Sequence, residues 1–195
     1  MKILGLTGSI ATGKTFVAEI FKKNNIKLFI SDLEVAKLLK EKTVVEKIKE
    51  IKDLSLSVTK NKEIDKKLLS DIVFNNLKAL KILEKIVHPL IKNKIKSFIY
   101  SNKLEKVIVL DIPLLFENNY QFYCTKIITT FCSQNTQEKR ALERNNINKD
   151  KLNFIIKQQI PGNLKAALTD YLVYTDISVA HTKKQIDQIL LKELE

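Results

Sequence analysis

Residues 8–15 contain the feature that most limits what this chain can fold into. The segment Gly8-Ser9-Ile10-Ala11-Thr12-Gly13-Lys14-Thr15 matches G-x-x-x-x-G-K-[ST] at every fixed position. An apolar run at residues 2–7 precedes it, as for a buried strand, and residues 14–24 have the apolar spacing of a helix. The backbone N–H groups of such a loop, with the positive end of the helix, bind phosphate oxygens. The sequence therefore predicts a nucleoside triphosphate-binding P-loop protein.

The composition argues against the alternative, a chance match in a lysine-rich chain. The 195 residues include only 4 Gly and 3 Pro, which excludes collagen-like and loop-dominated architectures. Three of those Gly fall within the first 13 residues, in or beside the phosphate loop. The glycines therefore support the motif.

The net charge of +12 is compatible with a nucleic-acid or membrane-surface partner. Lys residues are spread evenly along a chain also rich in Ile, Leu and Asn, so we interpret the excess as compositional bias. No uncharged run reaches the roughly 18 residues of a membrane span. Cys124 and Cys132 lack metal-ligand spacing and no secretory signal is visible, which favours reduced thiols in a soluble, cytoplasmic protein.

Predicted strands alternate with predicted helices, which indicates an α/β fold with a parallel sheet and helices on both faces. We expect strands at 2–7, 27–30, 106–110, 126–131 and 171–174. We expect helices at 14–24, 33–39, 136–145 and 149–156. A last helix is expected to begin with a Thr182-x-x-Gln185 capping box. Residues 43–100 are almost wholly helical in pattern, with Pro89 expected to kink or restart the helix. This stretch is too long for a crossover and predicts an inserted helical subdomain. A helical pair at about 133–165 is expected to form a mobile cover.

Four polar positions suit phosphoryl transfer. Lys14 would reach the β- and γ-phosphates, and the Thr15 hydroxyl would ligate Mg²⁺. Asp111 follows the run V-I-V-L, as a carboxylate that holds Mg²⁺ or its waters does, although an ordinary strand-end carboxylate is the alternative. Asp32 follows the second strand and would orient an acceptor hydroxyl. Its alternative role is the N-cap of a helix starting at Leu33.

Arg140 and Arg144 are the only two Arg among 34 basic residues. At i and i+4 on a helix their guanidinium groups would share one face, and forked donors suit phosphate geometry. Surface ion pairs with Glu138 and Glu143 are the alternative. Because the chain has no N-K-x-D, a small-molecule kinase is favoured over a GTPase.

Several further segments carry a family resemblance: His88-Pro89-Leu90-Ile91, Ile112-Pro113-Leu114-Leu115-Phe116-Glu117, and a tail with Gln159-Ile160-Pro161, Lys165 and Thr169-Asp170. With the phosphate loop and Asp32, they make the chain resemble the dephospho-coenzyme A kinases from the first strand to about residue 176.

The resemblance implies transfer of the ATP γ-phosphate to the ribose 3′-hydroxyl of dephospho-coenzyme A, the last step of coenzyme A synthesis. It implies ATP and Mg²⁺. We also expect no nucleic-acid or membrane partner, and a monomer. The resemblance also implies one kinase domain (1–195), with a core at 1–31, 101–117, 124–132 and 166–195, an acceptor-binding helical subdomain at about 32–100, and a lid at about 118–165.

The site residues follow from the loop and the resemblance together. The expected catalytic residues are Asp32, Lys14 and Arg140, and the expected metal-binding residues are Thr15 and, through water, Asp111. The expected ATP-binding residues are Gly8, Ala11, Thr12, Gly13, Lys14, Thr15, Phe16, Arg140 and Arg144. The expected acceptor-binding residues are Asp32, His88, Pro89, Pro113 and Leu114.

The sequence departs from the family at three places. Ser9 and Ala11 stand where Gly is frequent, and a left-handed backbone at either would cost about 1–2 kcal/mol. The usual D-x-D is reduced to Ile30-Ser31-Asp32, and Tyr174-Thr175-Asp176-Ile177 replaces an Asn and Gly turn. The other hypotheses are a P-loop kinase for another small molecule or nucleotide, and a basic nucleic-acid-binding ATPase.

Overall fold

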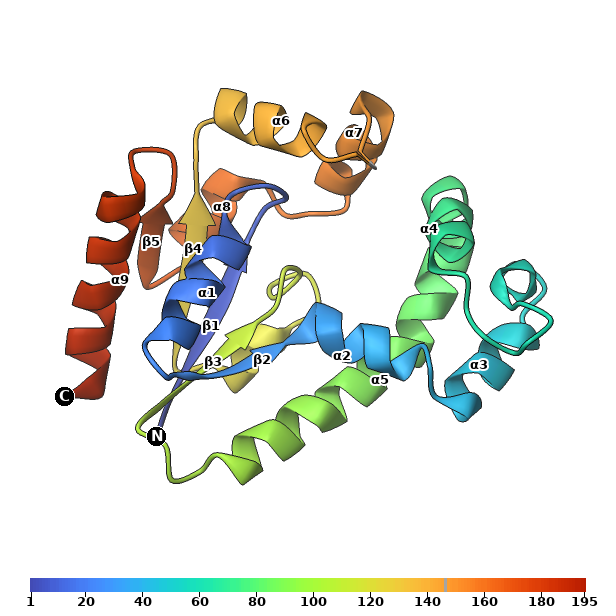
Figure 1. Ribbon diagram of the computed structural model, residues 1–195, viewed down its shortest axis with the longest axis horizontal. Helices are drawn as coiled ribbons and strands as arrows, with labels where there is room; N and C mark the ends of the chain where they lie inside the picture. Colours follow the sequence, from blue (N-terminus) through green and yellow to red (C-terminus); the bar gives the residue numbers. More distant parts are fainter. Residues whose placement is uncertain (146) are drawn as a thin grey trace. The chain divides into compact units, whose positions relative to one another are not determined.

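The computed structural model describes residues 1–145 and 147–195, and its contacts divide the chain into two units. The first unit contains Met1–Ile30 and Ile99–Glu195, and the second contains Ser31–Phe98 (Figure 1).

A five-stranded sheet organises the first unit. All its neighbouring strands are parallel, and their order is β2-β3-β1-β4-β5. The strands are β1 (Lys2–Gly8), β2 (Lys27–Ile30), β3 (Val107–Asp111), β4 (Lys126–Phe131) and β5 (Tyr171–Tyr174). This confirms the predicted α/β class. Because β1 is central and its neighbours β3 and β4 are parallel to it, the carboxyl ends of all three strands meet at the phosphate loop.

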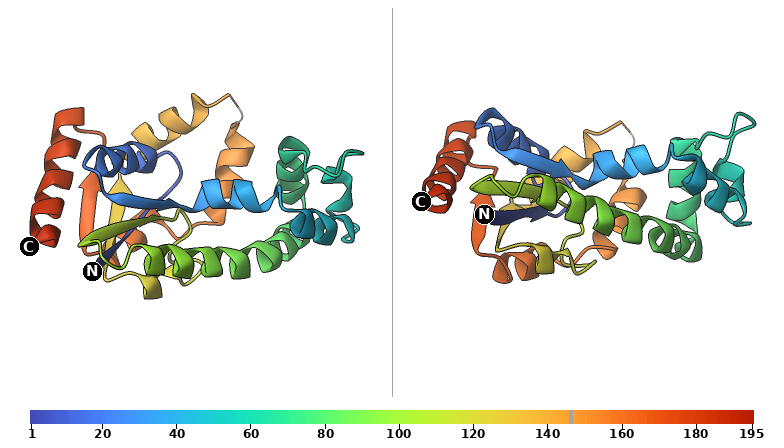
Figure 2. Two further views of the ribbon diagram at one scale, coloured as in Figure 1. Left: turned by 60° about the horizontal axis from the view of Figure 1, so that its bottom comes forward. Right: turned by 90° about the horizontal axis from the view of Figure 1, so that it is seen from below.

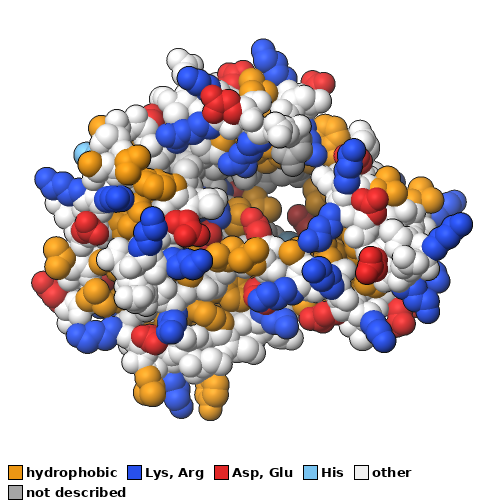
Figure 3. Space-filling view, in the orientation of Figure 1, with side chains coloured by type: hydrophobic (Ala, Val, Ile, Leu, Met, Phe, Trp, Pro, Cys, Tyr) orange, Lys and Arg blue, Asp and Glu red, His pale blue; other side chains and the backbone are white. Residues whose placement is uncertain are grey.

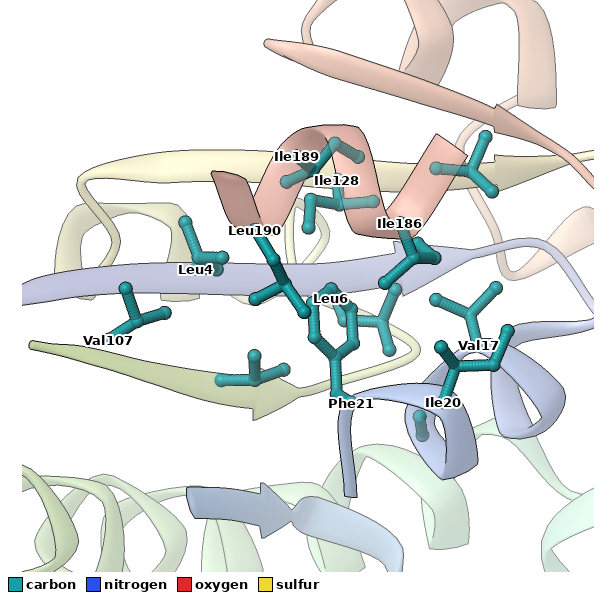
Figure 4. Packing of buried hydrophobic residues seen from close by; sticks show 13 residues of the cluster. Leu4, Leu6, Val17, Ile20, Phe21, Val107, Ile128, Ile186, Ile189 and Leu190 are labelled. Carbon is teal, nitrogen blue, oxygen red and sulfur yellow. The ribbon is translucent and has the colours of Figure 1, made fainter. Parts of the chain in front are cut away.

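Alternation along β1 assigns its side chains to two faces of the sheet. Leu4 and Leu6 are fully buried against α1 (Lys14–Lys23) and α9 (Val179–Leu194), which pack on the same face (Figures 1 and 4). The labelled side chains of that core come from both helices and from three strands (Figure 4). On the opposite face, a Cβ at Gly5 would overlap Leu115 and Cys124. α8 (Gly162–Ala167) contacts β4.

Among the described residues between β4 and β5 there are three helices, where two were expected. They are α6 (Gln134–Leu142), α7 (Lys149–Lys157) and the unpredicted α8. Because α6 ends at Leu142, Arg144 lies in the following turn, and the expectation that it shares a helix face with Arg140 is wrong. The predicted capping box is also wrong. Ser178 caps α9 through the His181 N–H, and the Gln185 side chain contacts the Tyr174 backbone.

The second unit is helical but less continuous than its pattern suggested (Figure 2). It contains α2 (Ser31–Leu38), α3 (Lys42–Lys49), the 3₁₀ turn η1 (Ser55–Ser57), α4 (Lys66–Asn75) and α5 (Leu77–Ser101), whose last three residues belong to the first unit. Between α3 and α4 the chain forms turns and an isolated bridge from Val58 to Ile64, so the helical expectation is wrong there. Helix α5 continues through Pro89 without restarting. The core of this unit includes Val44, Ile48, Leu54, Leu69 and Ala79.

Lys side chains are scattered over the visible face rather than gathered in one patch (Figure 3). This distribution agrees with the interpretation of the charge as a compositional bias. Within residues 1–145 and 147–195, none of the helices is long and apolar enough to cross a membrane.

Candidate active site

Two glycines shape the phosphate loop between β1 and α1. A Cβ at Gly8 would lie 2.1 Å from the Thr130 Oγ1 atom, so only a hydrogen fits there. Gly13 is the N-cap of α1 and has a φ of 86°, a left-handed conformation that glycine adopts without steric cost. The glycine positions of the motif are therefore required by close packing at one end of the loop and by backbone conformation at the other.

Hydroxyl groups hold the loop in shape. The Thr12 hydroxyl donates to the Ser9 carbonyl at 2.8 Å and lies 2.8 Å from the hydroxyl of Thr130 in β4. From the end of β5, the Thr175 hydroxyl donates to the Thr12 carbonyl at 2.8 Å. Two backbone carbonyls of the loop are thus bonded by hydroxyl groups, one from within the loop and one from the end of β5, and the Thr12 hydroxyl also contacts β4.

The tip of the loop contains a strained residue. Ala11 has a φ of 61°, and a left-handed backbone costs a residue with a Cβ about 1–2 kcal/mol. Ser9, the other position where the family often has Gly, is not left-handed. Ala11 is buried and packs against Ala141 of α6 and Leu152 of α7. Apolar contacts with two helices therefore accompany the strained conformation.

The first turn of α1 has N–H groups without partners inside the helix, because the carbonyls four residues before them do not belong to the helix. Lys14 is the first residue of that turn, and its Nζ atom forms an ion pair with the Asp111 carboxylate. The register places Asp111 opposite Leu6 of β1, two residues before the loop. The structure thus brings together a cation and a carboxylate that are 97 residues apart in sequence. Thr15 and Phe16 are exposed at the same helix end.

The donors at this helix end suit a hard cation. Mg²⁺ prefers oxygen ligands and usually binds through one or two protein groups, with waters and substrate phosphates completing the shell. The Thr15 hydroxyl and the Asp111 carboxylate are such groups. Among the described residues there is no cluster of three or more His, Cys, Asp and Glu side chains able to hold a metal. The donor set therefore fits an ion bound together with phosphates rather than in an all-protein cage.

Arg140 of α6 contacts the end of β5. Its guanidinium donates to the Thr175 hydroxyl at 3.1 Å and to the Thr175 carbonyl at 2.9 Å. The alternative ion pairs with Glu138 or Glu143 are not found in the described part of the chain. The Ser133 N–H, which donates to Asp176 at 2.7 Å, and the nearby Arg140 charge keep the pKa of that carboxyl below its usual range. In the sequence, the one feature that could have indicated Thr175 as a site residue is its position directly after the strand β5.

Glu117, the last residue of the I-P-L-L-F-E segment, forms a buried ion pair with Lys165. The Lys165 side chain is fully buried, and its Nζ atom lies 2.8 Å from Glu117 Oε1 and 3.2 Å from the Pro113 carbonyl oxygen. The same carbonyl accepts from the Thr7 hydroxyl at 2.9 Å. Glu117 Oε1 also accepts from the Ile160 N–H at 2.8 Å. Pro113 and Leu114 are half-buried beside this network.

The remaining predicted residues belong to the second unit. Asp32 is exposed in the first turn of α2, which begins at Ser31, so the alternative of an N-cap before Leu33 is wrong. His88 and Pro89 are neighbours in α5. Burial lowers the pKa of His88, although Glu84 opposes the shift and Lys92 adds to it.

The parallel sheet, the phosphate loop after its central strand and the Lys14–Asp111 pair define the chain as a P-loop kinase. A solved dephospho-CoA kinase from Campylobacter jejuni shares the fold with a TM-score of 0.68 and 27% identity, over 98% of this chain and 97% of that one. The model of the dephospho-CoA kinase family matches residues 2–181. Dephospho-CoA kinases of Bartonella quintana and Bartonella henselae are 35% and 36% identical, over 97% and 95% of both chains. The chain therefore belongs to the dephospho-CoA kinase family.

Proposed function

We propose that the chain transfers the γ-phosphate of ATP to the ribose 3′-hydroxyl of dephospho-coenzyme A, as a Mg²⁺-dependent monomer in the cytoplasm. The observation that carries this proposal, beyond membership of the family, is the Lys14–Asp111 pair at the open end of α1. It combines a phosphate-seeking cation with a carboxylate in the arrangement that phosphoryl transfer needs.

Lys14 and the N–H groups of the loop neutralise charge that develops on the transferring phosphate. They are preorganised, because glycine geometry, threonine hydroxyls and the ion pair fix them before the substrate arrives. When bound, Mg²⁺ would be held by the Thr15 hydroxyl and, through water, by Asp111, and would polarise the phosphate oxygens.

Asp32 has the role of orienting the acceptor hydroxyl. It lies two residues after Ile30, and Ile30 pairs with Asp111 in the sheet. A carboxylate that follows a strand at this edge is suited to accept the hydroxyl proton as the bond to phosphorus forms. His88, Pro89, Pro113 and Leu114 are assigned to the acceptor pocket.

The segment at about 118–165 is assigned the role of a lid. Closure would bring Arg140 and Arg144 toward the nucleotide phosphates and exclude water that would otherwise hydrolyse ATP. Arg140 would exchange its bonds to Thr175 for phosphate oxygens, for which its forked donors are better matched.

ADP release in the presence of different acceptors tests the substrate. We expect strong stimulation by dephospho-coenzyme A and none by AMP, CMP or an oligonucleotide. Stimulation by one of the other acceptors alone would contradict the proposal and would identify the correct class of substrate.

The substitution Asp32→Asn tests the proposed base. The variant should fold and bind ATP, but its kcat should fall by about 10²–10⁴, the range for loss of a general base. Asp53→Asn is the matched control, because Asp53 is an exposed carboxylate in the same unit. Near-normal turnover of Asp32→Asn would remove Asp32 from this role.

A further inference from the structure

Two glutamine side chains hold the tip of the phosphate loop from outside it. Gln159, between α7 and α8, accepts from the Ile10 N–H through Oε1 at 3.0 Å. Gln137, in α6, donates through Nε2 to the Ile10 carbonyl at 2.8 Å. The peptides on both sides of Ile10 are therefore fixed by amide groups from the segment between β4 and β5.

The bond from Gln137 controls where a peptide dipole points. A phosphate loop binds anions because its N–H groups face the ligand and its carbonyls face away. Gln137 holds the Ile10 carbonyl against α6. If that peptide rotated by half a turn, its carbonyl oxygen would point the opposite way and the sign of its contribution to the anion site would reverse.

Ala11 favours this rotation of the Ile10–Ala11 peptide, so another contact must oppose it. A half-turn of the Ile10–Ala11 peptide would move the φ of Ala11 from 61° to about −120°, an ordinary value for a residue with a Cβ. Rotation would therefore relieve the strain that Ala11 carries. A glycine at this position would gain nothing, because glycine adopts positive φ freely.

We propose that Gln137 and Gln159 are positioning residues for ATP binding. Gln137 blocks the rotation of the Ile10–Ala11 peptide, and Gln159 fixes the preceding peptide, so that the loop stays in its phosphate-binding conformation. The dependence on Gln137 is a consequence of Ala11 and would be weaker with Gly there. The inference rests on the proposed use of ATP, but not on the identity of the acceptor.

The same contacts link the loop to the proposed lid. Ala11 packs against Ala141 of α6, the helix that contains Gln137, and against Leu152 of α7, which ends shortly before Gln159. Displacement of α6 would remove the Gln137 bond and the apolar cover of Ala11 together. The conformation of the loop thus depends on helices well outside the motif.

Direct binding measurements on the full chain test the proposal. Gln137→Met and Gln159→Met keep the side-chain length but remove the amide. We expect each to weaken the binding of ATP and of inorganic tripolyphosphate about 5- to 10-fold, the effect of one lost hydrogen bond. Gln134→Met in α6 and Gln158→Met beside Gln159 are matched controls at exposed positions and should stay within about twofold of the parent.

A double-mutant cycle separates positioning from a general structural role. In an Ala11→Gly background, Gln137→Met should weaken tripolyphosphate binding by less than about threefold, since the strain that drives the rotation is gone. An equal loss in both backgrounds would overturn the proposal, as would a loss matched by the control variants. Retained ATP binding in the parent without phosphorylation of dephospho-coenzyme A would count against the proposed function and leave this inference standing.

Discussion

At the scale of single residues, Gly8 is a position in the loop where there is no room for a side chain. A Cβ there would meet Thr130 Oγ1 at 2.1 Å and Thr12 Oγ1 at 2.7 Å, and both hydroxyls are bonded to each other. Gly8→Ala should therefore cost about 1–3 kcal/mol, as overpacking does. At this chain length that lowers the melting temperature by roughly 2–10 °C.

Gly162→Ala is the matched control for this prediction. Its new Cβ would make only ordinary contacts, the nearest 3.5 Å from the Ser9 hydroxyl, at the start of a helix where alanine is favoured. We expect an unchanged or slightly higher melting temperature. Equal destabilisation by the two substitutions would mean that close packing at Gly8 is not the cause.

Asp176 provides a pH-dependent prediction. Its pKa is lowered, chiefly by the Ser133 N–H, so the carboxyl is more acidic in the folded chain than in the unfolded one. The charged form therefore stabilises the fold above about pH 4, and this contribution disappears as the pH falls through the lowered pKa. Asp176→Asn should lower the melting temperature by about 1–2 °C at pH 7, and this difference should shrink as the pH falls below about 4.

Thermal scans across pH 2.5–7.5 measure this difference. Asp187→Asn, at an exposed position on α9, is the control and should give a curve parallel to the parent. If the melting-temperature difference between Asp176→Asn and the parent stayed undiminished down to pH 2.5, something other than the charge of Asp176 would be responsible.

At the scale of elements, the Glu117–Lys165 pair joins α8 to the segment after β3. Removing one member of a buried pair leaves an uncompensated charge, which costs about 3–5 kcal/mol. Lys165→Met should show this loss in urea unfolding, because Glu117 would keep its carboxylate with only 13% of the side chain exposed. In a Glu117→Gln background the same substitution should cost clearly less.

Lys157→Met, on the exposed surface of α7, is the matched control and should change the free energy of unfolding by less than about 0.5 kcal/mol. Additive losses from Lys165→Met and Glu117→Gln would contradict the claim that the two side chains act as a pair.

Elements were predictable where the signal was local. β4 and β5 begin and end at the predicted residues, because short apolar runs bounded by polar residues fix a buried strand. The break between α3 and α4 was missed because Lys-rich and Leu-rich turns have a helix-like composition. The sequence gives little sign of α8, because the helix is only six residues long and begins at a Gly that directly follows its N-cap, Pro161.

The roles of the predicted site residues stay predictions, but the contacts among those residues show what a motif could indicate and what only tertiary structure reveals. Lys14 and Asp111 follow from the loop and from the end of a strand, and the fold brings them together. Gln137 had no signal of its own, since its contact with Ile10 depends on the approach of α6 and its proposed role depends on the left-handed Ala11. Lys165 is indicated only by the family resemblance, and its complete burial could not be predicted, because Lys side chains are rarely buried.

At the scale of the whole molecule, the charge of +12 has a physical consequence even if its origin is compositional. A field of one sign attracts anions at long range, and both proposed substrates are strongly anionic. Salt shortens the range of that field from about 10 Å at 0.1 M to about 3 Å at 1 M. Capture of substrates should therefore be more sensitive to salt than the chemical step, which occurs inside a preorganised site.

The prediction is that kcat/KM for dephospho-coenzyme A falls about 3- to 10-fold between 0.02 and 0.5 M NaCl, while kcat changes less than about twofold. Steady-state kinetics at constant free Mg²⁺ measure both, with sucrose at matched osmolality as the control for effects unrelated to charge. The distribution of Lys over the surface makes the effect general rather than local, so single Lys→Gln substitutions outside the site should each reduce it only slightly (Figure 3). If kcat/KM stayed constant across this range, the excess positive charge would have no part in substrate capture. ATP hydrolysis that is stimulated by oligonucleotides and suppressed by salt would instead support the hypothesis of a nucleic-acid-binding ATPase. The even spread of Lys along the chain and the presence of only two Arg argue against that hypothesis.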